Sequence, residues 1–296
     1  MTTLPESIKL LIIDIDGTLL NPEGQITPDT RAAVHAAQQA GIVVTLATAR
    51  RYCNTRQVAD ELGLEIPLIL YDGAQIVRHP QGQIMHSRTL AAHVAHEAID
   101  ILVRHAVQPV VHPLTGRDEE IWTGPPELDS LWQEAYFTTY PAQMRRMPYD
   151  LLTTDHAGIL RVVGFASEEA VEKMLPEVAA LDCSWNTIKR GSYGSAELAI
   201  MHAGCSKASG MLELAQRLGI PLTQVMAVGD NNNDIEMLQA AGWGVAMGQA
   251  ADAVKAAANA VTGSNSQDGV ARAIEHYALR RPTSAASNSL NRVTCL

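Results

Sequence analysis

Short apolar runs alternate with helical spacing through the first part of the chain. The pattern predicts buried strands at 8–13, 42–47 and 67–74, because each run is continuous, short and bounded by polar or turn residues. The segments between them, 28–40 and 54–62, have the spacing of helices. Strands that alternate with helices favour right-handed crossovers and an open parallel sheet.

The last third of the chain returns to the same alternation. It predicts two more buried strands, at 224–230 and 244–248. It also predicts four helices, at 206–218, 233–242, 250–258 and 268–279. The two parts together predict an α/β core, a Rossmann-like doubly wound parallel sheet, formed by residues 1–82 and 188–280.

The middle of the chain has a different pattern. A hairpin is expected at 75–88, and a strand at 158–165 precedes a helix at 167–181, whereas 112–150 has no clear period. We therefore expect residues 83–187 to form an α+β cap domain inserted into the core. The polar, aperiodic end of the chain, 281–296, predicts a disordered tail.

Composition narrows the range of functions. The 296 residues are 47% hydrophobic and 18% charged, and the formal net charge is −10. This charge disfavours nucleic acid and anionic membrane as partners, and a phosphate ester would need a local positive site. The four cysteines form no CxxC pair, and neither a secretion signal nor a membrane span is evident. We expect a cytoplasmic protein, monomeric by default.

The strongest chemical signal follows the first predicted strand. Asp14 and Asp16 are two residues apart, so in an extended chain both lie on the same side, at the strand end where open α/β sheets bind ligands. Neighbouring carboxylates repel unless a cation joins them, and Mg²⁺ suits hard oxygen ligands. The same residues also fit a plain Asp-Gly turn, in which Gly17 permits the turn and Thr18 forms a local hydrogen bond.

A second acidic motif, Gly-Asp-Asn-Asn-Asn-Asp at 229–234, follows another predicted strand. Asp230 and Asp234 are placed to complete a metal site. The alternative is an Asn-rich turn in which Asn233 or a neighbour caps the next helix, and capping and metal binding can coexist. Two acidic motifs after buried strands, about two hundred residues apart, favour the metal site over two unrelated turns.

Two weaker signals supply positive charge. Thr48 and Arg50 or Arg51 follow the second strand and suit an oxyanion, although a surface arginine is the commoner occurrence there. Ser206 is expected to cap a helix and places Lys207 in its first turn, where a lysine opposes the helix dipole. A nearby anion would explain this lysine, although a solvated lysine is the commoner case.

These segments, in this order, resemble the haloacid dehalogenase superfamily of phosphohydrolases. The resemblance covers about residues 8–82 and 188–280 and rests on Asp-Ile-Asp-Gly-Thr at 14–18, Thr48, Lys207 and the motif at 229–234. An insert between the third strand and the lysine helix is similar to the Cof-type subgroup, whose cap domain enters at that point.

The resemblance implies a role for each matching residue. Asp14 would attack phosphorus and form an aspartyl phosphate, and Asp16 would act as general acid and base. Mg²⁺ would be held by Asp14, Asp230 and the backbone carbonyl of Asp16, with Asp234 supporting Lys207 or a metal-bound water. The phosphoryl group would be bound by Thr48, Arg50, Lys207 and Asn233.

Three positions depart from the family pattern. Asp72-Gly73-Ala74 stands where Asn-Gly-Ala is usual, and Ala49 and Ala208 each replace a glycine. The extra carboxylate of Asp72 could change the preference for the leaving group. The cap should select the substrate, and its candidate contacts are His112, Arg117, Tyr136, Tyr140, Arg161 and Lys189.

The sequence thus predicts Mg²⁺-dependent hydrolysis of a small phosphate monoester, such as a sugar phosphate or a phosphorylated cofactor-like metabolite. Two alternatives stay open. A phosphohexomutase of similar fold would return the phosphoryl group to the sugar. A non-catalytic sensor of a phosphorylated metabolite would bind without turnover, although the intact pair Asp14 and Asp16 disfavours it.

Overall fold

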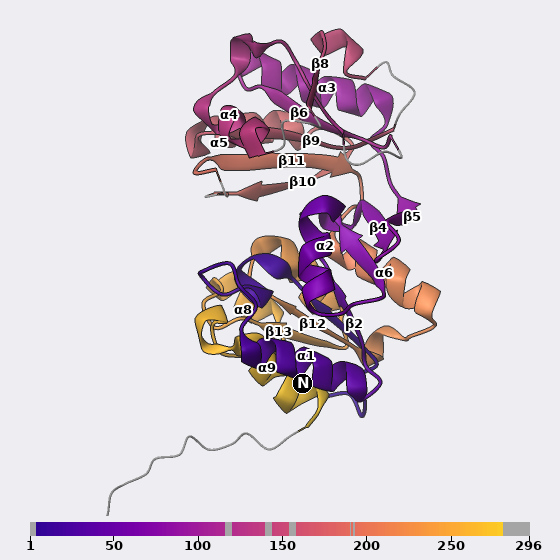
Figure 1. Ribbon diagram of the computed structural model, residues 1–296. Helices are drawn as coiled ribbons and strands as arrows, with labels where there is room; N and C mark the ends of the chain where they lie inside the picture. The colour runs from indigo at the N-terminus through magenta and orange to yellow at the C-terminus, as the bar shows by residue number, and fades with distance from the viewer. Residues whose placement is uncertain are drawn as a thin grey trace, which may run out of the picture.

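Two bodies of helices and strands stack on each other, a core below and a cap above in the view of Figure 1. The computed structural model describes residues 4–115, 120–139, 144–153, 158–189, 191 and 193–280. Within these residues, no helix is both long and apolar enough to cross a membrane. The expected tail at 281–296 lies outside the described residues.

The core contains a five-stranded parallel sheet in the order β14-β13-β12-β1-β2. Its strands are β1 (Leu10–Ile13), β2 (Val43–Leu46), β12 (Val225–Gly229), β13 (Trp243–Ala246) and β14 (Ala260–Val261). A parallel bridge between Ala47 and Ile69 continues the sheet to β3 (Pro67–Leu70). The predicted doubly wound α/β core is confirmed.

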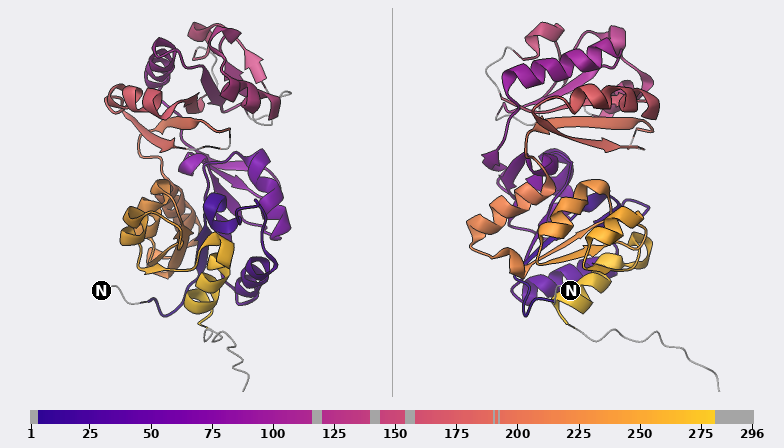
Figure 2. Two further views of the ribbon diagram at one scale, coloured as in Figure 1. Left: turned by 90° about the vertical axis from the view of Figure 1, so that its left-hand side faces the viewer. Right: turned by 180° about the vertical axis from the view of Figure 1, so that it is seen from behind.

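Helices cover both faces of this sheet, as the left-hand view of Figure 2 shows. Leu11 and Ile13 pack against α1 (Pro28–Gln39), α2 (Tyr52–Glu61) and α9 (Gly269–Ala273). Leu10 and Ile12 face the opposite layer, which is formed by α6 (Lys207–Leu218), α7 (Ile235–Ala240) and α8 (Asp252–Ala257). A strand buried on both faces has no polar alternation, which explains its continuous apolar run.

Strand register brings distant segments to one edge of the sheet. Ile13 at the end of β1 pairs with Val228 in β12 and with Leu46 in β2. The residues that follow these three strands therefore meet at the carboxyl edge, where open α/β sheets place their ligand sites.

A hairpin connects the core to the cap. β4 (Gln75–Arg78) pairs antiparallel with β3 and with β5 (Gln83–Ser87), so the hairpin predicted at 75–88 is present. Because β5 belongs to this three-stranded sheet, the cap begins after β5 rather than at residue 83, where the sequence placed it.

The cap is an α+β body with a six-stranded sheet in the order β10-β11-β9-β6-β7-β8. Its strands are β6 (Pro109–Pro113), β7 (Ile121–Thr123), β8 (Met144–Arg146), β9 (Ile159–Ala166), β10 (Cys183–Ile188) and β11 (Ala196–His202). The expected return to the core at residue 188 is wrong, because β11 pairs with β9 and the chain leaves the cap sheet only after His202.

The two faces of the cap sheet are covered differently. Helices α3 (Ala92–Arg104) and α5 (Glu168–Val178) bury one face, whereas α4 (Leu131–Thr139) packs against part of the other face. Figures 1 and 2 agree that the edge strand β10 is the cap strand nearest the core. The sheet therefore presents one edge and a partly covered face to the carboxyl edge of the core.

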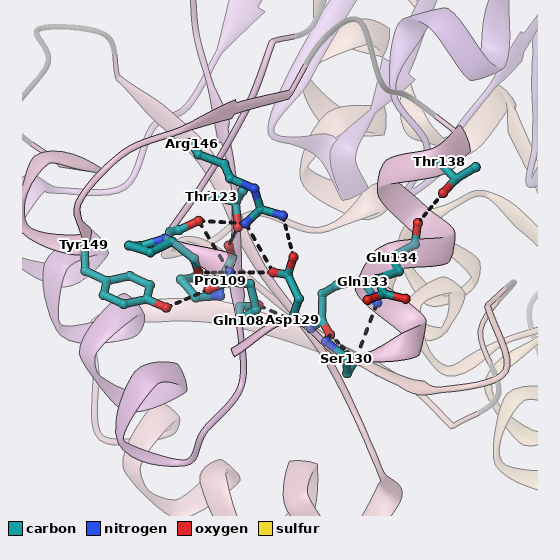
Figure 3. A network of polar contacts seen from close by, with 12 residues as sticks. Gln108, Pro109, Thr123, Asp129, Ser130, Gln133, Glu134, Thr138, Arg146 and Tyr149 are labelled. Carbon is teal, nitrogen blue, oxygen red and sulfur yellow. Dashed lines mark hydrogen bonds and ion pairs between the residues drawn. The ribbon is translucent and has the colours of Figure 1, made fainter. Parts of the chain in front are cut away.

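A cap network of four polar side chains, Gln108, Asp129, Arg146 and Tyr149, joins β8 to the loop after β7 (Figure 3). Arg146 forms an ion pair with Asp129 and donates Nη1 to the Gly124 carbonyl at 2.9 Å. Gln108 donates Nε2 to Asp129 Oδ1 at 2.7 Å and accepts from the Tyr149 hydroxyl at 2.8 Å. One cation meets one anion here, and both also bind neutral partners.

Candidate active site

Asp14 is the first residue after β1, and its side chain continues the alternation of that strand. Leu10 and Ile12 face the layer that contains α6, and Asp14 points the same way, toward Lys207 in the first turn of α6. Lys207 donates Nζ to Asp14 Oδ1 at 2.6 Å and is 2% exposed. The lysine is therefore buried against a carboxylate, which accounts for its unfavourable position in the helix dipole.

Two further carboxylates complete an acid cluster of Asp14, Asp230 and Asp234. One oxygen from each of the three lies within 4.8 Å of the others. Lys207 also donates to Asp234 Oδ1, at 2.7 Å. The other Asp234 oxygen accepts the backbone N–H groups of Asp230 and Asn231 at 3.0 and 2.9 Å, so Asp234 is held as a fixed partner for the lysine. Asn231 rather than Asn233 caps the one-turn helix Asn232–Asp234.

Burial and mutual repulsion shape the electrostatics of the acid cluster. Burial raises the pKa of Asp14 well above its usual range, despite the opposing charge of Lys207. Burial also raises the pKa of Asp230 to about 6, with a further contribution from the charge of Asp234. Burial opposes the charge of Lys207, but Asp14 and Asp234 outweigh it and raise the pKa of the ammonium. Three carboxylates thus face one buried cation.

Asp16 does not join the acid cluster, contrary to the expectation that its side chain lies on the same side as Asp14. The chain leaves the extended conformation in the turn Ile15–Leu19, where Gly17 has φ of +82°. Any side chain at Gly17 would collide with Asp230, because its Cβ would lie 2.5 Å from Oδ2. The Asp16 side chain is 60% exposed and accepts from Arg50 Nη2 at 2.5 Å and Nε at 2.7 Å.

Thr18 has a longer reach than the local hydrogen bond expected of it. Its hydroxyl donates to Asp230 Oδ1 at 2.7 Å, across 212 residues of sequence. The contact joins the turn after β1 to the end of β12. It therefore orients a carboxylate of the acid cluster, which local turn chemistry alone would not reveal.

The residues after β2 separate into two roles. Thr48 is 1% exposed, and its hydroxyl accepts the backbone N–H of Arg50 at 3.1 Å. The Arg50 side chain binds Asp16, whereas Arg51 is 2% exposed and lies 5.7 Å from the centroid of the Tyr136 ring in the cap. The sequence left both arginines open, and the structure gives each a different partner.

Asn233 contacts Asp72 rather than the acid cluster. Its Nδ2 donates to Asp72 Oδ1 at 2.9 Å. Asp72 follows β3, is 2% exposed, and has φ of +49° in the turn Tyr71–Gly73. The end of β3 thereby becomes a fourth segment at the carboxyl edge of the core.

A cavity of about 530 Å³ lies between the core and the cap. Three of the six predicted cap contacts line it, namely His112, Tyr136 and Arg161. Lys189 does not: its side chain is 79% exposed and lies 4.0 Å from Glu168. Arg117 and Tyr140 lie outside the described residues. The core contributes residues that include Asp16, Arg50, Arg51 and Asp72.

Sequence reasoning missed several lining residues, including Val163, Phe165, Asn186 and Tyr193. Two of these residues could have been found from the sequence. Val163 and Phe165 share the period-two face of β9 with Arg161, so one assignment on this strand implies the others. Asn186 belongs to β10, a strand that the sequence did not predict.

His112 lies in the cavity as a neutral group. Burial lowers its pKa well below the usual range, and the positive charges of Arg161 and Arg51 lower it further. Its Nε2 lies 3.5 Å from the Tyr136 hydroxyl, and Nδ1 is buried and has no hydrogen-bond partner among the described residues. The cavity therefore carries neutral polar, cationic and aromatic groups together.

Comparison with known proteins gives independent evidence for the family to which the chain belongs. Residues 11–274 match the family described as haloacid dehalogenase-like hydrolase. The Bacillus subtilis (strain 168) protein YxeH is 30% identical over 92% of this chain and 99% of its own length. YcsE of the same organism, a 5-amino-6-(5-phospho-D-ribitylamino)uracil phosphatase, is 28% identical over 92% and 96%. A haloacid dehalogenase-like hydrolase structure from B. subtilis superposes with a TM-score of 0.75 at 29% identity, covering 91% of this chain and 99% of the other.

Proposed function

The chain belongs to the haloacid dehalogenase-like hydrolases and is a phosphatase of that family, and from this premise we propose that it hydrolyses a small phosphate monoester with Mg²⁺ through an aspartyl phosphate on Asp14. One observation carries the proposal. A buried lysine binds Asp14 and Asp234 at the carboxyl edge of the sheet, with Asp230 in the same cluster.

A divalent cation suits the acid cluster. Three carboxylates share one buried ammonium, and burial, with a smaller contribution from the neighbouring carboxylates, raises the pKa values of Asp14 and Asp230. Asp14, Asp230 and the backbone carbonyl of Asp16 would hold the ion, and their hard oxygens match Mg²⁺. When bound, Mg²⁺ neutralises phosphoryl oxygens and so favours attack by an anion.

In the proposed first step, an Asp14 carboxylate oxygen forms a bond to phosphorus while the bond to the ester oxygen breaks. Asp16 gives its proton to the departing oxygen. Its side chain suits this role because it lines the cavity between core and cap, outside the acid cluster. Arg50 must release or follow the Asp16 carboxylate, because it binds both carboxylate oxygens.

In the second step, water attacks phosphorus, Asp16 takes the proton of that water, and the bond from phosphorus to Asp14 breaks. Inorganic phosphate leaves and Asp14 is restored. Lys207 would stabilise the charge on the phosphoryl oxygens throughout, with Asp234 fixing its position. Thr48, Arg50 and Asn233 would contribute further contacts to the phosphoryl group.

The cavity volume suits a small phosphorylated metabolite as substrate. YcsE, the relative named for a phospho-ribitylamino uracil, indicates that the same architecture accepts a substrate of this size. We propose that the protein works in the cytoplasm. We also propose that it works as a monomer, because the cap supplies the second wall of the cavity within one chain.

Phosphate release from p-nitrophenyl phosphate with and without Mg²⁺ tests the proposal. Wild-type protein should release phosphate only with the metal, and Asp14→Asn should abolish release. Rapid quenching with a ³²P-labelled substrate should trap acid-stable label on wild-type protein and none on the variant. Equal hydrolysis by both proteins would refute the role of Asp14. Transfer between two positions of a hexose phosphate without free phosphate would favour a mutase.

A further inference from the structure

Asp72 carries a buried carboxylate that the proposed reaction does not use. We propose that it determines substrate specificity by accepting a hydrogen bond from a donor on the leaving group, either a hydroxyl or an ammonium. This inference rests on the proposed function, because it assigns a chemical property to the group that leaves phosphorus.

One oxygen of Asp72 is satisfied within the protein and the other is not. Oδ1 accepts from Asn233 at 2.9 Å, whereas Oδ2 is buried and has no hydrogen-bond partner in the part of the chain that the structure describes. The side chain belongs to a residue that is 2% exposed, and none of the ion pairs among the described residues includes it. A buried carboxylate oxygen without a donor is costly, so a ligand that supplies one would gain affinity.

The backbone does not explain why this residue is an aspartate. Tyr71 and Asp72 both have positive φ, at +51° and +49°, and the Asp72 N–H donates to the Thr48 carbonyl at 3.0 Å. Asparagine tolerates this left-handed conformation as well as aspartate does. An asparagine oxygen could also accept the same bond from Asn233. An amide would therefore meet the backbone and hydrogen-bond requirements of this position, and what it would lack is the negative charge, which helps to raise the pKa of Lys207.

Asp72 lies where two cavities meet. It lines the cavity of about 530 Å³ and a second one of about 400 Å³ beneath the edge strand β10. Asn233 lines the second cavity and connects Asp72 to the segment that carries Asp230 and Asp234. A substrate whose phosphoryl group reaches the acid cluster would extend its leaving group past this carboxylate.

The nearby arginine does not neutralise Asp72. Arg161 lies 5.0 Å from the centroid of the Tyr71 ring and donates Nη1 to the Ala49 carbonyl at 2.8 Å. Its Nε is buried, and no described residue forms a hydrogen bond with it. The cavity thus offers an acceptor at Asp72 and a donor at Arg161, so it can read polarity along a leaving group. A site with a buried acceptor discriminates against ligands that lack the matching donor.

The test compares leaving groups with and without hydrogen-bond donors, and propyl phosphate and glycerol 1-phosphate form the pair matched in chain length. We would measure kcat/KM with Mg²⁺ for propyl phosphate, glycerol 1-phosphate, ribitol 5-phosphate and O-phosphoethanolamine. Wild-type protein should prefer donor-bearing substrates, and Asp72→Asn should reduce that preference by about tenfold to a hundredfold, since the variant presents an amide donor to the cavity. Preference for glycerol 1-phosphate and ribitol 5-phosphate over propyl phosphate identifies a hydroxyl, and preference for O-phosphoethanolamine over all three identifies an ammonium.

The matched control is Asp60→Asn, which removes a carboxylate on α2 outside the lining of both cavities and should leave the ranking of substrates unchanged. Far-ultraviolet circular dichroism and thermal unfolding check that Asp72→Asn is folded. An equal loss on all four substrates, or no donor preference in wild type, would overturn the specificity role. Failure of wild type to hydrolyse even p-nitrophenyl phosphate would instead overturn the proposed function.

Discussion

Two networks of charged side chains, one in each half of the molecule, have opposite charge balances. In the core, one buried ammonium faces the three carboxylates of the acid cluster. In the cap network, one guanidinium faces one carboxylate, and the neutral side chains of Gln108 and Tyr149 take up remaining hydrogen-bonding capacity. Both networks join segments that are not adjacent in sequence, so the two networks differ in charge balance and not in the kind of segments that they connect.

The difference in charge balance indicates a different role for each network. A balanced, fully bonded pair needs nothing from outside the protein and stabilises the loop that it joins. An unbalanced buried cluster keeps repulsion that only an added cation or a protonation event can relieve. The acid cluster is therefore expected to bind a cation at the place where the reaction is proposed, whereas the cap network is not.

The largest effect should come from Asp14→Asn. We expect turnover to fall by about a thousandfold or more, because the nucleophile is removed. The raised pKa of Asp14 means that its ionised form is disfavoured in the folded protein, so the metal-free variant should be no less stable than wild type at pH 7. Phosphate-release assays measure the loss of turnover, and urea unfolding in EDTA measures the stability. A large loss of stability would contradict the unbalanced cluster.

Removing the cation from each network should separate them by stability. Lys207→Met leaves three carboxylates without a cation, and we expect a loss of about 3 to 5 kcal/mol in the free energy of unfolding in EDTA. Mg²⁺ should restore part of this loss. Arg146→Met should cost less, about 1 to 3 kcal/mol, because Asp129 keeps its bond from Gln108. If Mg²⁺ restored the stability of Arg146→Met, or failed to restore any stability to Lys207→Met, the proposed difference between the two networks would be refuted.

The pH dependence of metal-free stability should reveal Asp230. Its folded-state pKa is raised to about 6 from 3.8, so its protonated form is favoured in the folded state, and the stability it contributes is lost as pH rises through about 6. The difference in Tm between Asp230→Asn and wild type, measured in EDTA, should therefore grow between about pH 4 and 6 and then level off. A constant difference across that range would show that burial and the charge of Asp234 do not raise the pKa of Asp230.

The smallest expected effect belongs to Thr18→Val, which deletes one hydrogen bond to Asp230. The hydroxyl holds the carboxylate in position, so we expect a several-fold rise in the Mg²⁺ concentration that gives half-maximal activity. Stability should change by about 1 kcal/mol. Thr18→Ser, which keeps the hydroxyl, is the control and should resemble wild type. If both variants weakened Mg²⁺ dependence equally, the hydrogen bond would not be the cause.

Several features of the core could be predicted because they follow from local rules. Continuous apolar runs mark strands buried on both faces, and parallel strands deliver their carboxyl ends to one edge. The convergence of Asp14, Asp230 and Asp234 on Lys207 follows from that rule. The strand at 196–202 was missed, although its burial alternates along part of its length as expected of a half-covered antiparallel strand.

The sequence by itself determined which segments would meet and which chemistry they would carry. Only the tertiary structure decided how individual side chains divide the work: the turn at Gly17 sends Asp16 to Arg50, and Thr18 crosses to Asp230. It also decided that Asp72 opens onto a cavity shared with the cap. The reason is that strand register depends on a repeating local pattern, whereas a turn or a cavity wall depends on which distant atoms fill the space beside it.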